Sequence, residues 1–131
     1  MKGFVRNIEE LTEANNDFRR VLYTGSNLQL VLMAIAPGDE IGEEVHHDID
    51  QFFRIETGQG EVWIDGVCHK VRADDGIVVP QGATHNVKNT GKETLRLYTI
   101  YGPPEHVDAT VHATSAEAAA AHEHFDGKTT E

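Results

Sequence analysis

The sequence predicts an all-β fold, either a sandwich or a barrel, followed by one short C-terminal helix. About nine short runs rich in β-branched and aromatic residues alternate with turn residues between about 18 and 104. Asp65-Gly66, between two of these runs, is typical of a two-residue hairpin, because both central positions of such a turn need positive φ. The length of 131 residues suits one domain, so we expect residues 1–131 to form a single unit.

The expected strands follow one another in a regular order, and each ends at a group of turn residues. They cover residues 18–24, 28–36, 44–46, 51–57, 61–64, 67–71, 76–79, 84–88 and 95–101. The turns that separate them lie at 25–26, 37–38, 48–50, 58–60, 65–66, 80–82, 89–91 and 102–104, and are rich in glycine, proline, asparagine and aspartate. Short strands at this spacing indicate a closed or two-layered β-structure.

The last quarter of the chain changes from a strand-like to a helix-like composition. Thr114-Ser115-Ala116-Glu117 has the spacing of a capping box, in which two side chains satisfy the free N–H groups at the start of a helix. The alanine-rich stretch that follows has high helix propensity as far as Phe125. We therefore expect a helix over about 115–125, with residues 126–131 frayed.

The chain is strongly acidic, with 22 Asp and Glu against 11 Lys and Arg and a formal net charge of −11. This charge repels nucleic-acid phosphates and anionic membrane surfaces, so we expect neither as a partner. No apolar run reaches the roughly 18 residues of a membrane span, and the N-terminus lacks the apolar segment of a secretory signal. We therefore expect a cytoplasmic protein, in which the single cysteine, Cys68, is buried and unreactive.

Residues 38–58 resemble the first motif of the cupin superfamily, whose members are small β-barrels. That motif places a glycine shortly before His-x-His, and then a glutamate and a second glycine at fixed intervals. The matching positions here hold Gly38, Glu44-Val45-His46, Gln51 and Gly58. Glutamate thus stands in place of the first histidine, and glutamine in place of the glutamate.

Residues 74–89 resemble the second cupin motif. In this motif a glycine comes before Pro-x-Gly, and a histidine and an asparagine follow it. The matching positions hold Asp74, Pro80-Gln81-Gly82, His85 and Asn89, with Asp74 in place of a glycine. The chain is therefore similar to small single-domain cupins that are described as phosphomannose isomerase-like. The resemblance implies a jelly-roll barrel, also called a double-stranded β-helix, that holds one metal ion.

Strand geometry agrees with the resemblance on the candidate ligands. Side chains two apart in a strand point to the same side, so Glu44 and His46 share a face and Glu43 points away. The resemblance adds His85, which we expect to close the site from the opposite side. It also adds Gln51, either as an amide-oxygen ligand or as a hydrogen-bond partner of bound water or substrate. Two imidazoles and a carboxylate suit one divalent ion, Fe, Mn, Zn or Ni, with open coordination positions.

The remaining polar and aromatic residues are assigned by position and type. We expect the other histidines on the surface or at an interface: His47, His69, His106, His112, His122 and His124. Glu43, Tyr98 and Tyr101 are candidates for a catalytic proton donor or base by residue type alone. Phe52 is expected to face outward. Because cupins frequently dimerise through sheet faces, the resemblance implies a homodimer, with burial of Phe52 under a terminal segment as the alternative.

The resemblance and the ligand set together favour a metal-dependent enzyme that acts on a small polar metabolite, such as a sugar, a keto acid or another carboxylate. The ion would act as a Lewis acid in isomerase- or lyase-type chemistry. Two alternatives stay open: an Fe(II)-dependent dioxygenase, and a non-catalytic module that binds a sugar or another small molecule. The sequence shows no cluster of lysine and arginine that would clamp a phosphorylated substrate.

Overall fold

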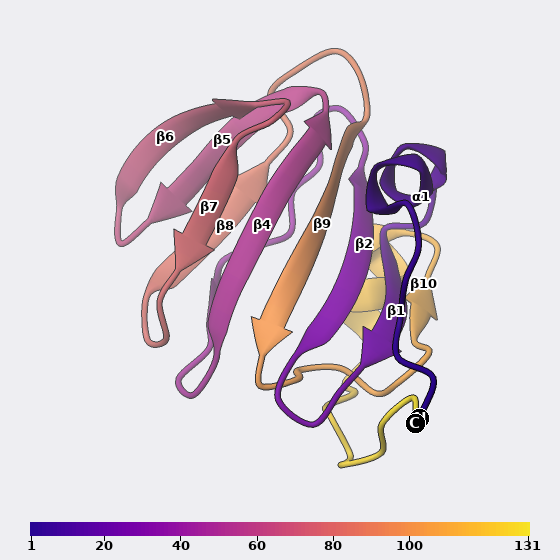
Figure 1. Ribbon diagram of the computed structural model, residues 1–131. Coiled ribbons are helices and arrows are strands. Elements are labelled where there is room, and N and C mark those ends of the chain that lie inside the picture. Colours follow the sequence, from indigo (N-terminus) through magenta and orange to yellow (C-terminus); the bar gives the residue numbers. More distant parts are fainter.

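The computed structural model describes residues 1–131, which form two antiparallel sheets that face each other (Figure 1). The strands are β1 (Arg19–Thr24), β2 (Gln29–Ile35), β3 (Glu44–Val45), β4 (Asp50–Thr57), β5 (Gln59–Ile64), β6 (Val67–Arg72), β7 (Gly76–Val79), β8 (Thr84–Lys88), β9 (Leu95–Gly102) and β10 (Val111–His112). The larger sheet has the order β10-β1-β2-β9-β4-β7, and the smaller sheet has the order β3-β8-β5-β6. The all-β prediction is confirmed, since β1 to β9 coincide with the expected strands to within two residues at each end.

Two helices, α1 (Ile8–Ala14) and α2 (Ser115–Ala120), complete the fold, and neither has the length and apolar character needed to cross a membrane. The sequence analysis did not predict α1. Asn7 caps it by accepting a hydrogen bond from the Glu10 N–H at 3.1 Å. The helix packs against β2, β4 and β9 of the larger sheet. Its seven residues are too few to show a helical pattern of apolar side chains in the sequence.

The C-terminal helix ends at Ala120, so the predicted end near Phe125 is wrong. Thr114 caps its start, in agreement with the predicted capping box. Ala121 then has extended backbone angles, with φ −83° and ψ 141°. The N–H of Phe125 donates to the Glu105 carbonyl at 2.8 Å. Tertiary hydrogen bonds to the barrel therefore override the helix propensity of the local sequence.

Residues 126–131 are held against β1 and are not frayed, which corrects the prediction. The N–H of Thr130 donates to the Thr24 carbonyl at 2.9 Å. The Glu131 carboxylate accepts hydrogen bonds from the Tyr23 hydroxyl and from the N–H groups of Lys2 and Gly3, each at 2.7 Å. The two ends of the chain therefore lie side by side, as Figure 1 shows.

The core lies between the two sheets and contains a cluster of 16 buried apolar residues. Phe53 and Ile55 of β4 point into it with 1% and 0% of their surface exposed. Phe52 and Arg54 point outward, as strand alternation predicts, and the Phe52 ring lies 6.4 Å from that of Tyr98. Each fully buried side chain of this size contributes about 1.5–3 kcal/mol, so the core is a firm support for the site. The homodimer stays a prediction.

Two turns lie at positions that the sequence analysis singled out. Asp65 and Gly66 both have positive φ, 46° and 81°, which confirms the tight hairpin predicted between β5 and β6. Asp74 stands where the cupin motif has glycine, and its φ is 76°. Aspartate visits this left-handed region more readily than most residues, so the replacement preserves the turn.

Cys68 lies exposed on β6, so the prediction of a buried thiol is wrong. β6 is an edge strand of the smaller sheet, and nearly all of its side chains are exposed. The thiol donates a hydrogen bond to Glu61 Oε2 at 2.8 Å, and this bond to the carboxylate raises the pKa of Cys68. The higher pKa reduces the fraction of reactive thiolate at neutral pH.

Candidate metal centre

Glu44 and His85 lie opposite each other on neighbouring strands of the smaller sheet. The register of β3 and β8 pairs Glu44 with His85 and Val45 with Thr84. His46 follows Glu44 by two residues and returns to the same face. One ligand-type atom from each of Glu44, His46 and His85 lies within 4.8 Å of the other two. The structure thus brings together three side chains that the sequence singled out.

The orientation of the His85 ring is fixed by its backbone neighbour. His85 Nδ1 lies 3.2 Å from the Ala83 carbonyl, an acceptor, so Nδ1 carries the proton and Nε2 carries the free lone pair. Nε2 is buried without a hydrogen-bond partner and lies 4.0 Å from Glu44 Oε2. This nitrogen is therefore free to accept a ligand inside the barrel.

His46 lies between two carboxylates. Its Nε2 is 3.0 Å from Glu44 Oε2, and its Nδ1 is 3.7 Å from Glu105 Oε2. Glu105 Oε1 in turn lies 3.4 Å from His124 Nδ1. A carboxylate behind the second nitrogen of a histidine orients the ring and makes the first nitrogen a stronger ligand. The sequence analysis did not predict this role for Glu105, which lies outside both motifs.

Gln51 lies on β4 of the larger sheet, whereas His85 lies beside Glu44 in the smaller one. The prediction that His85 closes the site from the opposite side is therefore wrong. Gln51 is 3% exposed and pairs with Tyr101 across β4 and β9. Its Nε2 donates to the Thr99 hydroxyl at 2.9 Å, while its Oε1 is buried without a partner. Gln51 thus offers a second free acceptor atom from the facing wall.

The hydrogen bond between Glu44 and His46 shifts the pKa values of the two side chains in opposite directions. Burial raises the pKa of the Glu44 carboxyl, but the hydrogen bond to His46 and the charges of His46 and Arg19 outweigh it, so the pKa lies below its ordinary 4.5. The bond to Glu44 raises the pKa of His46 above its ordinary 6.5, against the effect of burial. A divalent cation can take the place of the hydrogen that joins the two side chains, because it too is attracted by the carboxylate.

This donor set fits a divalent metal ion. Two imidazole nitrogens and one carboxylate converge, and the pair His85 Nε2 and Gln51 Oε1 have no other partner. Buried polar atoms without a partner are rare in folded proteins, and an ion would satisfy both. Glu44, His46 and His85 can hold the ion with Gln51 beside them, leaving coordination positions open.

Sequence and structure comparisons agree with the motif assignment. The model of the cupin domain family matches residues 31–101, a segment that contains Glu44, His46, Gln51 and His85. The chain belongs to the cupin family. The family prediction and the barrel fold that it implied are confirmed.

Relatives of this cupin cover most of its length. It is 47% identical over 126 residues to the uncharacterized protein YrkC of Bacillus subtilis, with 92% of this chain and 68% of YrkC covered. The crystal structure of BH2720 from Bacillus halodurans superimposes with a TM-score of 0.90 at 46% identity, covering 92% of this chain and 96% of BH2720. Part of the mannose-1-phosphate guanylyltransferase of Escherichia coli is 29% identical over 76 residues, which are 58% of this chain and 16% of that enzyme.

Of the three catalytic candidates in this cupin, Tyr101 is the one that lies at the cluster. Its ring meets the edge of His46 with centroids 5.8 Å apart, and its hydroxyl lies 3.3 Å from His106 Nε2. Burial raises the pKa of Tyr101 well above its ordinary 10, so the phenol stays protonated. Tyr98 lies on the outer face of β9, and Glu43 is exposed outside the cluster.

Buried polar residues that the sequence analysis missed surround the cluster. His106 and His112 are 7% and 8% exposed, so their predicted surface positions are wrong. The exposed histidines, as predicted, are His47, His69, His122 and His124. Arg19 is 6% exposed and pairs with His112 across β1 and β10. No local pattern signals these residues, because they are buried by the C-terminal segment as it returns to the barrel.

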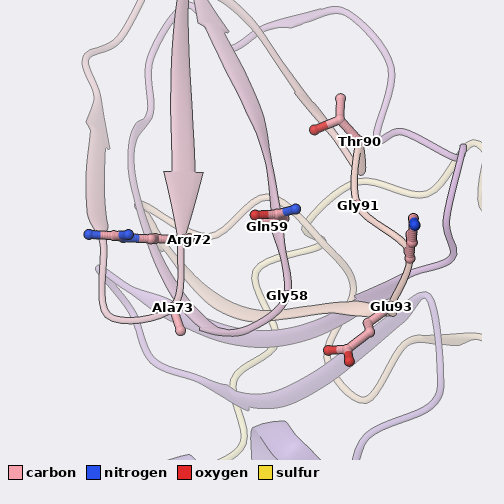
Figure 2. Close-up of a pocket in the computed structure, with 8 residues that line it drawn as sticks. Gly58, Gln59, Arg72, Ala73, Thr90, Gly91 and Glu93 are labelled. Carbon is pink, nitrogen blue, oxygen red and sulfur yellow. The ribbon is translucent and has the colours of Figure 1, made fainter.

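The largest hollow of the cupin, about 490 Å³, lies elsewhere on the surface, around the β4–β5 turn and the loop between β8 and β9. Figure 2 shows the Arg72 guanidinium pointing away from the loop that carries Thr90 and Glu93. The polar groups around this hollow therefore do not converge. A second acidic group, Glu9, Glu13 and Glu56, is largely exposed and contains no histidine. Neither place offers the convergent donors of the Glu44 cluster.

Proposed function

We propose that this cupin is a metal-dependent enzyme acting on a small polar metabolite, with one divalent ion held by Glu44, His46 and His85 and with Gln51 as a fourth ligand. The observation that carries the proposal is the state of His85 Nε2. This atom is buried without a partner and lies 4.0 Å from Glu44 Oε2. An unsatisfied buried acceptor costs about 1–3 kcal/mol, and a bound cation would remove that cost.

The residues next to the cluster can hold and move a proton. Glu123 Oε1 lies 2.8 Å from His106 Nδ1, so the carboxylate accepts that N–H and leaves His106 Nε2 as an acceptor. The Tyr101 hydroxyl, 3.3 Å away, can then donate to His106 Nε2. Such a chain can hold a proton at the Tyr101 oxygen, from which it can be donated to an oxygen of the substrate. A bound metal ion would supply Lewis-acid polarisation of the substrate oxygens, as isomerase- or lyase-type chemistry requires.

The same ligand set supports a second candidate function. Two histidines and one carboxylate with open positions are also the ligands of non-haem Fe(II) oxygenases. Dioxygen uptake with iron, absent with zinc, would favour the dioxygenase over the isomerase or lyase. Stoichiometric metal without any turnover would favour a non-catalytic module that binds a small molecule.

Hydrogen–deuterium exchange tests the leading proposal before the substrate is known. Metal-stripped protein is reloaded separately with Mn, Fe, Ni or Zn and incubated in deuterated water with 2-oxobutanoate or dihydroxyacetone. We expect about one ion per chain and metal-dependent exchange of the hydrogens next to the carbonyl. Tyr101→Phe should keep the metal and lose most of the exchange. Failure to bind any of the four ions in stoichiometric amount would contradict the proposal.

A further inference from the structure

A cavity of about 180 Å³ opens beside the candidate ligand Glu44. Its walls come from β1, from the chain around Glu44, and from α2 with the residues that follow it. They include Arg19, His106, Ala118 and Glu123. At roughly 30 Å³ per water molecule, the cavity has room for about six waters. The cavity can therefore take only a small molecule, which would lie beneath the C-terminal segment.

The Arg19 guanidinium lines this cavity and has unused hydrogen-bonding capacity. Its Nη1 lies 3.2 Å from His112 Nδ1, while its Nε is buried without a partner. No carboxylate lies within ion-pair distance of it. The Phe18 ring, 5.5 Å away, gives the cation one apolar neighbour. Because arginine stays charged at all relevant pH values, a positive charge is buried here without a direct ion pair, and it acts on Glu44 and Glu123 only from a longer distance.

The two carboxylates of the cavity are engaged elsewhere. Glu44 is hydrogen-bonded to His46 at 3.0 Å. Glu123 accepts hydrogen bonds from His106 Nδ1 at 2.8 Å and from the Val107 N–H at 3.2 Å. Neither therefore forms a direct ion pair with the guanidinium, although the charge of Arg19 lowers the pKa of both. A divalent ion at Glu44 would make the cavity more positive still, so the charge balance favours an anionic occupant.

We infer that Arg19 binds a carboxylate group of the substrate while other oxygens of the same molecule reach the metal centre. The inference rests on the proposed function and narrows its substrate class to small organic acids with an anionic group remote from the metal-binding end. Neutral sugars do not meet this requirement. The planar fork of a guanidinium matches the two oxygens of a carboxylate, whereas a hydroxyl group would leave the charge uncompensated.

A pair of acids that differ by one carboxylate tests the inference. Malate and lactate share a 2-hydroxy acid end that can bind a metal, and malate alone has a second carboxylate. Cobalt(II)-loaded protein is titrated with each acid, and binding is followed by the visible absorption of the ion. We expect malate to bind at least about tenfold more tightly than lactate, the equivalent of about 1.4 kcal/mol. In Arg19→Met the affinity for malate should fall to that for lactate, so that the two acids bind alike.

Arg20→Met is the matched control. Arg20 is the next residue of β1, is exposed and pairs with Asp17 at 2.9 Å, so its loss removes the same charge outside the cavity. This variant should keep the preference for malate. Arg19→Lys, which keeps the charge without the planar fork, should show an intermediate preference and provides the test if Arg19→Met does not fold.

Thermal unfolding separates binding from a structural role of Arg19. Replacing a buried charge that forms no direct ion pair by an apolar side chain of similar size removes the cost of burying that charge, so Arg19→Met should unfold at the wild-type temperature or above it. Equal affinities of the cobalt-loaded wild type for malate and lactate would overturn the inference and leave the metal proposal intact. Failure to bind cobalt would overturn the proposed function and the inference with it. A malate preference that survives in Arg19→Met would also refute the role of Arg19.

Discussion

Glu44 and His85 come from different sequence motifs, yet they are direct neighbours across β3 and β8, with Glu44 Oε2 and His85 Nε2 4.0 Å apart. A shift of this register by one residue would turn one of the two side chains to the opposite face of the sheet. The candidate metal centre therefore depends on strand pairing as much as on the residue types. Glu44 supplies the negative charge of this centre. Its carboxylate is hydrogen-bonded to His46 and also faces His85.

Glu44 and Glu43 offer a test in which neighbouring residues receive the same substitution. Glu44→Gln should lower the affinity for a divalent ion by more than about 100-fold, because it removes the one carboxylate of the cluster. Glu43→Gln removes the same charge from an exposed side chain and should leave the affinity within about twofold. Titration of metal-stripped protein with zinc measures both. Equal losses in the two variants would show that net charge, and not the cluster, determines binding.

Gln51→Met should separate metal binding from stability. The substitution removes the unpartnered Oε1, and Thr99 keeps its hydrogen bond to the Phe52 carbonyl. We expect the metal-free variant to unfold in urea with a free energy equal to that of the wild type or about 1 kcal/mol higher, because an unsatisfied buried acceptor is lost. Its affinity for zinc should fall by about tenfold to 100-fold. A clear loss of stability together with unchanged affinity would assign Gln51 to the core.

Glu123 should make the stability of the protein depend on pH in the acid range. Burial raises the pKa of Glu123, but the hydrogen bonds from His106 and the Val107 N–H and the charge of Arg19 outweigh it, so the folded value lies below the ordinary 4.5. The stabilisation is therefore complete above the unfolded value and is lost as the pH falls through the folded value. Glu123→Gln should flatten the fall of the melting temperature below pH 4.5. Glu93→Gln, at an exposed position, should retain the wild-type slope, and a wild-type slope in Glu123→Gln would contradict the assignment.

Cys68 should become more reactive when its hydrogen-bond acceptor is neutralised. The carboxylate of Glu61 accepts the thiol hydrogen at 2.8 Å and raises the pKa of Cys68. In Glu61→Gln the pKa should return toward its ordinary 9.0, so alkylation by iodoacetamide at pH 8 should become several times faster. The rate is measured on folded protein. A rate equal to the wild type at every pH would rule out control by Glu61.

The sequence predicted the strands and the three central side chains because both depend on local patterns. Strand alternation alone places Glu44 and His46 on one face, and the spacing of the second motif singles out His85. The Asp65-Gly66 turn was predictable for the same reason, since its φ requirement belongs to two adjacent residues. The position of His85 beside Glu44 was not predictable, because it depends on which strands pair.

The surroundings of the site depend on the C-terminal segment, and the sequence alone did not reveal them. Arg19 is buried by pairing of β1 with β10, and Glu123 reaches His106 because the chain leaves the helix at Ala120. The alanine-rich composition predicted a longer helix, which would have carried Glu123 elsewhere. Tertiary contacts decided the outcome, and they join residues that share no local pattern.

The most direct test of the account is the metal content of three single-histidine variants purified in parallel and measured by elemental analysis after reloading with zinc. The wild type and His47→Ala, which removes an exposed histidine next to the cluster, should each retain about one ion per chain. His46→Ala and His85→Ala should each retain less than about a tenth of that amount while keeping the circular dichroism of a β-barrel. Stoichiometric zinc in both His46→Ala and His85→Ala would contradict the central claim that these side chains hold the ion together with Glu44.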